Sequence, residues 1–320
     1  MWNLALMYER GEGLEQDYIK AIEWYEKAAE AGNRNAAARA EELRKALSPV
    51  TPEEMYERGR EYARGDGVKQ DYAQAVEWYE KAAMAGNTDA MNELGLLYYT
   101  GEGVKQDYAQ ARKYFEMAAD AGSPDGMFRM GDLYYYGQGV AQSYSKAAVW
   151  YQEAADLNNV PAISRLATLY YFGEGVSQNY IKAAELYEMV ADAGDSSGMV
   201  NLGDMYYEGK GVKQSYATAA EWYEKAAEAG NLAAMKNLAD MYFYGRGVEK
   251  NYTIVLEWYE KAAKAGDPFA MFRIGEMYDK GEGVKQDYVK AIEWYEKAAG
   301  FTGYRYAARR AAELREALGM

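Results

Sequence analysis

A Gly-x-Gly motif that recurs every 36 residues constrains the fold of this chain more than any other feature. Seven copies keep that spacing without a change, at Gly65/Gly67, Gly101/Gly103, Gly137/Gly139, Gly173/Gly175, Gly209/Gly211, Gly245/Gly247 and Gly281/Gly283. A fixed period of this length is typical of a solenoid, in which each unit buries its apolar side against its neighbours. The sequence therefore predicts a repeat array, and dividing its 320 residues into domains by length alone would mislead.

Each unit predicts two amphipathic helices, which we call helix A before the glycines and helix B after them. Helix A of one unit carries apolar or small residues at i, i+3, i+4 and i+7, namely Met91, Leu94, Gly95 and Tyr98. Helix B of that unit repeats the spacing with Tyr108, Ala111, Tyr114, Ala118 and Ala119. We therefore expect an all-α fold, a right-handed α/α solenoid of 36-residue helix-pair repeats.

The residues at the expected helix ends support this interpretation. The position before helix B always offers a side chain that can cap a helix N-terminus: Asp71, Asp107, Ser143, Asn179, Ser215, Asn251 and Asp287. Helix B is followed by residues that tolerate a left-handed backbone: Gly86, Gly122, Asn158, Gly194, Gly230 and Gly266. Another capping residue then opens the next helix A: Asn87, Ser123, Asn159, Asp195, Asn231 and Asp267. Pro124 and Pro268 stand at the first helical position, where proline is favoured.

The repeat register breaks once, near the start of the chain. Gly11/Gly13 belongs to the motif but precedes Gly65 by 54 residues, one period plus 18. The extra segment contains AARAEELRKAL at 37–47, which is similar to AARRAAELREAL at 307–318 and has the charged outer face of a capping helix. We predict a partial repeat with a cap-like helix over 1–47, a break or linker over 48–54 with the next helix opening at Glu53, a repeat array over 55–300, and a C-terminal capping helix over 301–320.

Two arrangements remain open for the extra helix. Residues 1–47 could end a first array in its own cap, or the helix could be accommodated inside one continuous solenoid with a local change of curvature.

Composition excludes several classes of function. The chain has 36 Lys plus Arg against 50 Asp plus Glu, a net charge of −14, which disfavours nucleic acid and anionic membrane surfaces as partners. It has no cysteine and no histidine, so thiolate or histidine catalysis and the metal sites built on these residues are excluded. No apolar run approaches the length of a membrane helix, and no basic leader opens the chain. We expect no membrane insertion, and a cytoplasmic location unless the chain is a fragment of an exported protein.

Motifs that resemble catalytic chemistry do not carry it here. Gly-x-Gly lies between two helices, lacks a third glycine and follows no strand, so it does not predict a nucleotide-binding loop. Carboxylate pairs such as Asp204 and Asp240 could act as acid and base only in an enclosed pocket, which the sequence does not indicate. We predict a protein that is not an enzyme, with no catalytic residue, cofactor or metal site.

The repeat units resemble the Sel1-like repeat family, relatives of the tetratricopeptide repeats. The pattern A-M-x-x-L-G-x-x-Y-x-x-G-x-G-V-x-Q-D-Y-x-x-A-x-x-W-Y-x-x-A-A-x-A-G is nearly whole at 90–122 and at 234–266, and the resemblance covers almost the entire chain. It implies a scaffold for protein–protein interactions, as in bacterial signalling and host contact and in eukaryotic protein quality control. One bacterial branch staples each repeat with a disulfide, and the lack of cysteine excludes that branch.

Helix A has a second face, turned about 80–180° from its core stripe. By resemblance to tetratricopeptide repeats, this face lines the concave surface. Three columns of residues recur on it. The aromatic column is Tyr99, Tyr135, Tyr171, Tyr207 and Phe243. The outer column is Thr100, Tyr136, Phe172, Glu208 and Tyr244. The acidic column is Leu96, Asp132, Thr168, Asp204, Asp240 and Glu276. Phe128, Phe269 and Phe272 would add apolar area.

These columns predict a groove with an aromatic wall beside an acidic strip. The predicted partner-binding residues are Tyr99, Tyr135, Tyr136, Tyr171, Phe172, Tyr207, Phe243, Tyr244, Asp132, Asp204, Asp240 and Glu276. Rigid aromatics and carboxylates would select a protein or peptide segment with basic or aromatic residues. The competing interpretation is structural: the tyrosines pack between repeats and the acids lie on a solvated face. Carbohydrate binding by the tyrosine columns is the alternative function, and self-association through the array ends is a further one.

Overall fold

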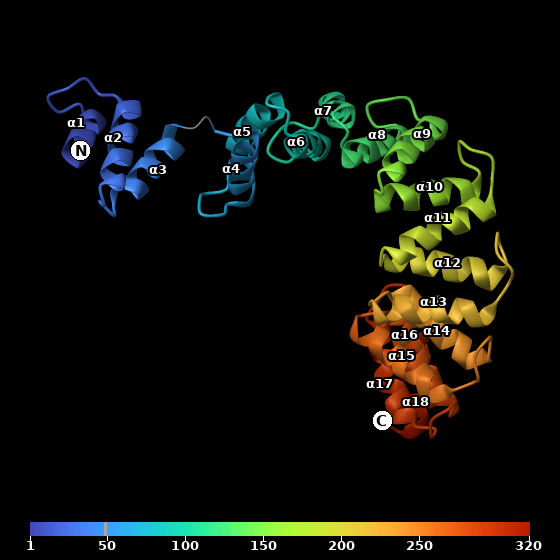
Figure 1. The fold of residues 1–320 in the computed structure, drawn as a ribbon. Helices are drawn as coiled ribbons and strands as arrows, with labels where there is room; N and C mark the ends of the chain where they lie inside the picture. The colour runs from blue at the N-terminus through green and yellow to red at the C-terminus, as the bar shows by residue number, and fades with distance from the viewer. Residues whose placement is uncertain (48–49) are drawn as a thin grey trace. The chain divides into compact units, whose positions relative to one another are not determined.

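The structure is a computed structural model that describes residues 1–47 and 50–320, and over these residues every regular element is an α-helix (Figure 1). It divides into two units, Met1–Ala90 and Met91–Met320. The helices of the first unit are α1 (Trp2–Arg10), α2 (Tyr18–Glu30), α3 (Ala36–Leu47), α4 (Pro52–Arg64) and α5 (Tyr72–Met84). Helix α6 (Thr88–Thr100) begins at the end of the first unit and continues into the second.

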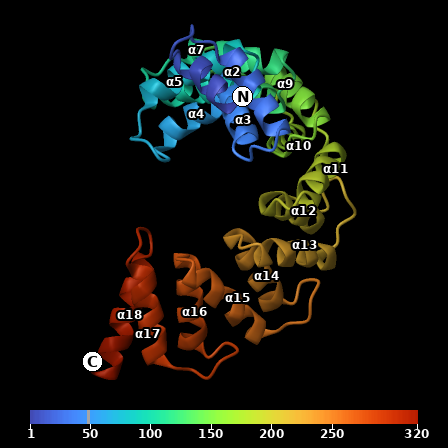
Figure 2. The same cartoon turned by 60° about the vertical axis from the view of Figure 1, so that its left-hand side comes forward.

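The second unit alternates the two predicted helix types. Its further helices A are α8 (Pro124–Tyr136), α10 (Val160–Phe172), α12 (Ser196–Glu208), α14 (Leu232–Tyr244) and α16 (Pro268–Lys280). Its helices B are α7 (Tyr108–Asp120), α9 (Tyr144–Asp156), α11 (Tyr180–Asp192), α13 (Tyr216–Glu228), α15 (Tyr252–Lys264) and α17 (Tyr288–Ala299), and α18 (Arg305–Leu318) ends the chain. From α8 to α18 the helices follow one another along a curved path (Figure 2). The prediction of an all-α solenoid of helix pairs is confirmed.

The predicted helix ends are confirmed by their hydrogen bonds. Asp107 and Ser215 illustrate the cap of helix B, because each side chain accepts a bond from backbone N–H groups of the first turn. Asn158, the one non-glycine in its series, adopts φ 61°, the left-handed conformation predicted there. One boundary differs: α4 begins at Pro52 rather than Glu53, because Thr51 is the N-cap and forms a capping box with Glu54.

Glycines allow close contact both within and between repeats. A Cβ atom at Gly203 of α12 would lie 2.7 Å from the Tyr223 ring of α13, so this glycine lets the buried ring lie flat against helix A. A Cβ at Gly211, the second glycine of the motif, would lie 2.1 Å from the carbonyl oxygen of Tyr180 in the preceding repeat. The second glycine is therefore required for its left-handed backbone and for the stacking of repeats.

The core of the second unit lies between helices A and B. Helix B contributes its largest fully buried side chains, among them Tyr151, Tyr259 and Tyr295, and small alanines line the same helices. Tyr134, Tyr170 and Tyr206 of helix A pack against this core, as the sequence predicts. The tryptophans of helix B are structural as well, because Trp258 is buried and Trp222 and Trp294 pack against the core.

Residues of α1, α2 and α3 form a core cluster of their own. Ala5, Tyr25, Ala36, Ala40 and Leu43 are its main buried members. The predicted break over 48–54 includes Ser48 and Pro49, which lie outside the described residues. The predicted division of the chain at this break stays a prediction.

Candidate functional site: the helix-A face of the second unit

The aromatic column is half-buried rather than open. Each of its rings packs edge-on or tilted against the first residue of helix B in its own repeat, at ring-centroid distances of 4.9–5.5 Å. The pairs are Tyr99–Tyr108, Tyr135–Tyr144, Tyr171–Tyr180, Tyr207–Tyr216 and Phe243–Tyr252. The rings of this column therefore contribute to the fold, and their part in binding a partner stays a prediction.

Hydroxyl groups of the aromatic column also join successive repeats. Tyr99 donates to Gln138 Oε1 at 2.6 Å, and Lys210 donates to the Tyr171 hydroxyl at 2.7 Å. Arg246 donates to the Tyr207 hydroxyl in the same way. In each case the partner comes from the glycine loop of the following repeat, so these tyrosines help fix one repeat on the next.

The outer column supplies the exposed aromatic surface. Tyr136, Phe172 and Tyr244 have exposed fractions of 48%, 62% and 55%. Their neighbours in the column, Thr100 and Glu208, are exposed polar residues. Rings exposed to this degree in three of the repeats are the aromatic part of the face that a partner could reach.

The acidic column is less solvated than its sequence suggests. Tyr151 of helix B donates to Asp132 at 2.8 Å, Tyr223 donates to Asp204 at 2.5 Å, and Tyr259 donates to Asp240 at 2.6 Å. A buried tyrosine hydroxyl requires a hydrogen-bond partner, and the carboxylates provide it. These acids therefore have a structural role that a solvated helix face would not give them.

Of the other members of the acidic column, Thr168 and Leu96 follow the same rule and Glu276 does not. Thr168 exchanges a hydrogen bond of 3.0 Å with the Tyr187 hydroxyl. Where the column has Leu96, helix B carries Phe115, which has no hydroxyl to satisfy. Glu276 instead forms ion pairs with Arg273 at 2.7 Å and with Lys280 at 2.9 Å.

Two equivalent acids of the column differ in their charged neighbours. Asp132 lies 3.8 Å from both Arg129 and Arg165, whereas among the described residues no ion pair involves Asp204. Burial raises the pKa of Asp132, and its two arginines oppose that rise. Burial also raises the pKa of Asp204, and the nearby Glu208 carboxylate raises it further. Of these two acids, Asp204 is thus the one whose negative charge is less compensated.

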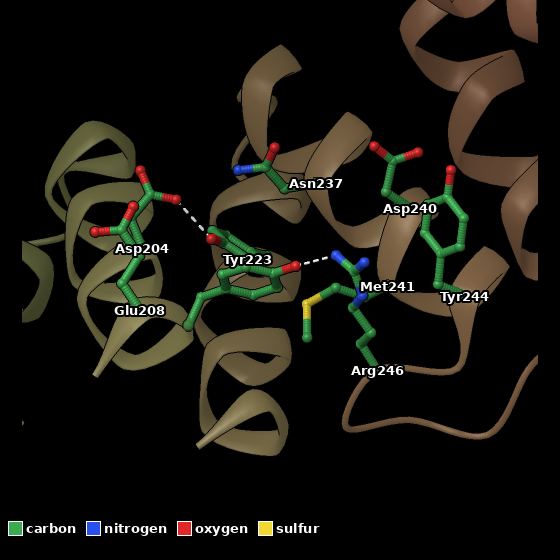
Figure 3. Close-up of a pocket in the computed structure, with 9 residues that line it drawn as sticks. Asp204, Glu208, Tyr223, Asn237, Asp240, Met241, Tyr244 and Arg246 are labelled. Atoms are coloured by element: carbon green, nitrogen blue, oxygen red, sulfur yellow. Dashed lines mark hydrogen bonds between the residues drawn. The ribbon is translucent and has the colours of Figure 1, made fainter. Parts of the chain in front are cut away.

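Two adjoining cavities open beside Asp204. The larger, of about 410 Å³, lies between α12, α13 and α14 (Figure 3) and is lined by Asp204, Tyr207, Glu208, Tyr223, Asn237, Asp240, Met241, Tyr244 and Arg246. The smaller, of about 300 Å³, is lined by Thr168, Tyr171, Phe172, Tyr187, Asn201, Asp204 and Glu208. Asp204 and Glu208 line both, so the two cavities form one acidic recess between the exposed rings of Phe172 and Tyr244.

Half of the predicted site residues line this recess, together with others that the sequence did not indicate. Tyr171, Phe172, Tyr207, Tyr244, Asp204 and Asp240 line the recess, whereas Tyr99, Tyr135, Tyr136, Asp132, Phe243 and Glu276 lie outside it. Asn201, Asn237 and Arg246 are the additions that matter most. Reading the position three residues before the acidic column down the repeats would have found the two asparagines.

The described residues offer no sign of metal or membrane chemistry at this face. Within 1–47 and 50–320, no group of three or more acidic residues is arranged to hold a metal ion. Over the same residues, no helix has both the length and the apolar character needed to cross a bilayer.

A stack of helix pairs with a repeating side-chain face is the architecture of an α-helical repeat protein. Eight segments match the family described as Sel1 repeat, at residues 1–33, 55–87, 88–123, 124–159, 160–195, 196–231, 232–267 and 268–299. The chain therefore belongs to the Sel1 repeat family. Proteins of this family commonly serve as protein-interaction scaffolds and are generally non-catalytic.

Two solved structures of the same fold are similar over most of the chain. One is c5321, a protective antigen present in uropathogenic Escherichia coli strains, with 36% identity and a TM-score of 0.73 over 100% of this chain and 64% of that one. The other is a Sel1 repeat protein from Oxalobacter formigenes, with 32% identity and a TM-score of 0.67 over 77% of this chain and 99% of that one. The chain thus spans about two thirds of the length of the antigen. No curated protein sequence matches the chain.

Proposed function

We propose that the helix-A face of residues 91–320 binds an extended segment of a partner protein, without catalysis. The observation that carries this proposal is the recess at Asp204, which adjoins the exposed rings of Phe172 and Tyr244. Rings of this kind offer a large contact area at low cost in side-chain entropy, and half-buried carboxylates select basic segments. The face therefore suits a partner segment that carries both basic and apolar or aromatic residues.

The aromatic column contributes more to the fold than the outer column does, and this difference guides the choice of variant. Replacing the aromatic column would disturb the packing of Tyr171 on Tyr180 and of Tyr207 on Tyr216, so a loss of binding could reflect a damaged fold. The rings of the outer column are exposed and each packs on one neighbouring ring of the aromatic column, so their removal should disturb the fold less. The binding-face variant is therefore the triple substitution Tyr136→Ser, Phe172→Ser and Tyr244→Ser.

The proposal is tested by a displayed-peptide selection on the intact chain and on the binding-face variant. A matched control replaces three exposed apolar residues of helices B: Val149→Ser, Ile181→Ser and Val289→Ser. We expect basic and aromatic peptides to be enriched by the intact chain and by the control, and not by the binding-face variant. Equal enrichment by the binding-face variant, or enrichment by none of the three proteins, would overturn the proposal. Circular dichroism verifies that all three are equally helical.

A further inference from the structure

One position of helix A determines whether the acidic column is neutralised by the chain itself. This flanking position lies three residues before the acidic column, and it reads Glu93, Arg129, Arg165, Asn201, Asn237 and Arg273 in successive repeats. Asp132 lies 3.8 Å from the flanking residue of its own helix, Arg129, and 3.8 Å from that of the next helix A, Arg165.

Arg165 shows what an arginine does at the flanking position. Its Nε lies 3.8 Å from Asp132 Oδ1 in the preceding repeat, and its Nη2 donates to the Tyr136 hydroxyl at 3.0 Å. The guanidinium also lies 5.9 Å from the centroid of the Tyr135 ring and 5.8 Å from that of Tyr136. The cation is therefore held between the acidic, aromatic and outer columns of one repeat.

Arg273 occupies the flanking position of the last repeat, residues 268–299, and also lies against rings of the preceding repeat. Its guanidinium lies 5.1 Å from the ring centroid of Phe243 in the preceding repeat and 6.0 Å from that of Tyr259. Tyr259 is the tyrosine that donates to Asp240, but no ion pair joins Arg273 to this acid among the described residues. Its ion pair with Glu276 fixes the side chain from its own helix.

At Asp204 both flanking positions are asparagines, and this is where the cavities open. Asn201 on the same helix and Asn237 on the next are short and neutral, and one lines each cavity. Tyr223 occupies one oxygen of the Asp204 carboxylate. Arg246 donates to the hydroxyl of Tyr207, and its guanidinium lies 5.8 Å from the centroid of that ring and 5.0 Å from that of Tyr244. Figure 3 shows Arg246 on the opposite side of the Tyr223 ring from Asp204, and among the described residues no ion pair joins the two.

The outer column adds a second carboxylate, Glu208, to the cavity beside Asp204. Beside Asp132 the outer-column residue is Tyr136, whose hydroxyl accepts a hydrogen bond from Arg165. The equivalent residue beside Asp204 is Glu208, so a carboxylate replaces that hydroxyl. Lys210 pairs with Glu208 at 2.7 Å, but both side chains are more than a third exposed. An exposed pair of this kind is weak and leaves Glu208 able to accept from another donor.

We propose that the larger cavity takes the guanidinium of an arginine in the partner, in the place that Arg165 fills for Asp132. This inference rests on the proposed function and names the side chain that the recess selects. The guanidinium would bond to Asp204 and Glu208 and lie over the Tyr207 ring, because these residues correspond to Asp132, Tyr136 and Tyr135. A planar guanidinium suits two carboxylates and an aromatic face better than an ammonium group does.

The first measurement compares three short fluorescein-labelled peptides by fluorescence anisotropy on the full chain. Their sequence is glycine, serine and tyrosine around one central arginine, lysine or citrulline. We expect the arginine peptide to bind about tenfold more tightly than the citrulline peptide, and also more tightly than the lysine peptide. Because lysine and arginine carry the same charge, attraction to the acidic protein as a whole cannot explain that difference.

The second measurement fills or removes the site. Asn237→Arg places the chain's own guanidinium in the cavity and keeps both carboxylates, so the arginine peptide should bind about tenfold more weakly. Asp204→Asn should weaken binding to a similar degree, whereas Glu221→Gln on the exposed side of α13 makes the same change in net charge and should leave the affinity unaltered.

Each outcome decides the inference. Equal binding of the arginine and lysine peptides, or unchanged binding to Asn237→Arg in a folded protein, would overturn the arginine assignment. If peptides from the selection still require Phe172 and Tyr244 but show no arginine preference, the proposed function stands and this inference falls. If no peptide binds the intact chain, both fall. Thermal unfolding of each variant shows that it is folded.

Discussion

The site of Asp279 at the end of the array and the recess at Asp204 both contain a carboxylate and a tyrosine that donates to it. They differ in whether an arginine also pairs with the carboxylate. In both, a carboxylate of helix A accepts a hydrogen bond from a buried tyrosine of helix B, Tyr295 at 3.2 Å and Tyr223 at 2.5 Å. At the end of the array, Arg310 of α18 adds a fork of two bonds to the Asp279 oxygens, at 2.8 and 2.9 Å. At the recess, no arginine in the described part of the chain donates to Asp204.

The arginine at the end of the array reverses the effect that burial has on the pKa of the carboxylate. The Arg310 guanidinium holds the pKa of Asp279 below its usual value, while burial raises the pKa of Asp204. The charge of Asp279 therefore contributes to stability, whereas the charge of Asp204 opposes it. A carboxylate that the fold buries without a cation retains its capacity to bind one from outside.

The segment α1–α3 repeats the arrangement at the end of the array. Arg39 of α3 pairs with Glu9, which also accepts from Tyr25, and Arg39 holds the pKa of Glu9 below its usual value. Burial and the bond to Glu9 raise the pKa of Tyr25 to about 12. A second ion pair also recurs, as Arg44–Glu26 and Arg315–Glu296. These contacts support the proposal that α3 caps the first repeat as α18 caps the last.

The largest expected effect comes from removing a cap arginine. Arg310→Ala leaves the buried Asp279 carboxylate without its cation, and we expect a loss of about 2–4 kcal/mol in the free energy of unfolding. Because terminal repeats of a solenoid open first, amides of α18 should exchange faster in hydrogen-exchange measurements than those of α12. Arg39→Ala should have a comparable effect on α3.

The neighbouring arginine of the same helix is the control for that prediction. Arg309 is exposed, with a long contact of 3.6 Å to Glu313 and its guanidinium 5.2 Å from the Tyr306 ring centroid, so Arg309→Ala should change the free energy of unfolding by less than about 1 kcal/mol. Equal losses for Arg309→Ala and Arg310→Ala would show that the fork to Asp279 does not hold the cap.

Removing the tyrosine hydroxyl should lower the free energy of unfolding more at the recess than at the cap. Tyr223→Phe takes away the donor that Asp204 uses, and we expect a loss of about 1–2 kcal/mol in chemical denaturation. Tyr295→Phe should cost about half as much, because Asp279 keeps both bonds from Arg310. Phenylalanine fits sterically at this position, since Phe115 occupies it in another repeat. A larger loss at Tyr295 would contradict the comparison.

The smallest expected effect, about 1 kcal/mol, concerns pH. The contributions of Asp279 and Asp204 to the free energy of unfolding should change in opposite directions as pH falls. The pKa of Asp279 is lowered in the folded state, so its contribution is present above the usual aspartate pKa and is lost as pH falls through the folded value. The pKa of Asp204 is raised, so its contribution is present below the usual aspartate pKa and is lost as pH rises through the folded value.

Denaturation of two variants between pH 3 and pH 7 checks this sign. Relative to the intact chain, Asp279→Asn should be least stable at neutral pH, and its deficit should shrink on acidification. Asp204→Asn should be as stable as the intact chain or slightly more so at neutral pH, with that advantage lost in acid. Parallel curves for the two variants would mean that the acids have equivalent surroundings.

Helix boundaries could be predicted from the sequence because their causes are local. Ser143 caps α9 through contacts within a few residues, and Asn158 ends it through its own backbone conformation. The 36-residue period then places equivalent side chains on one face, so the three columns could also be predicted. The aromatic column was harder to interpret, because the packing of Tyr171 on Tyr180 depends on the angle between two helices.

By itself, the sequence determined the helix pairs, their period, the family and the residues that share the helix-A face. Only the tertiary structure decided which of those residues are satisfied within the chain. Asp132 and Asp204 occupy the same position of their repeats, but Arg165 from the next repeat covers one and Asn237 stands beside the other. Burial and charge compensation depend on residues that only stacking brings together, and for that reason the recess at Asp204 appears in the structure and not in the repeat pattern.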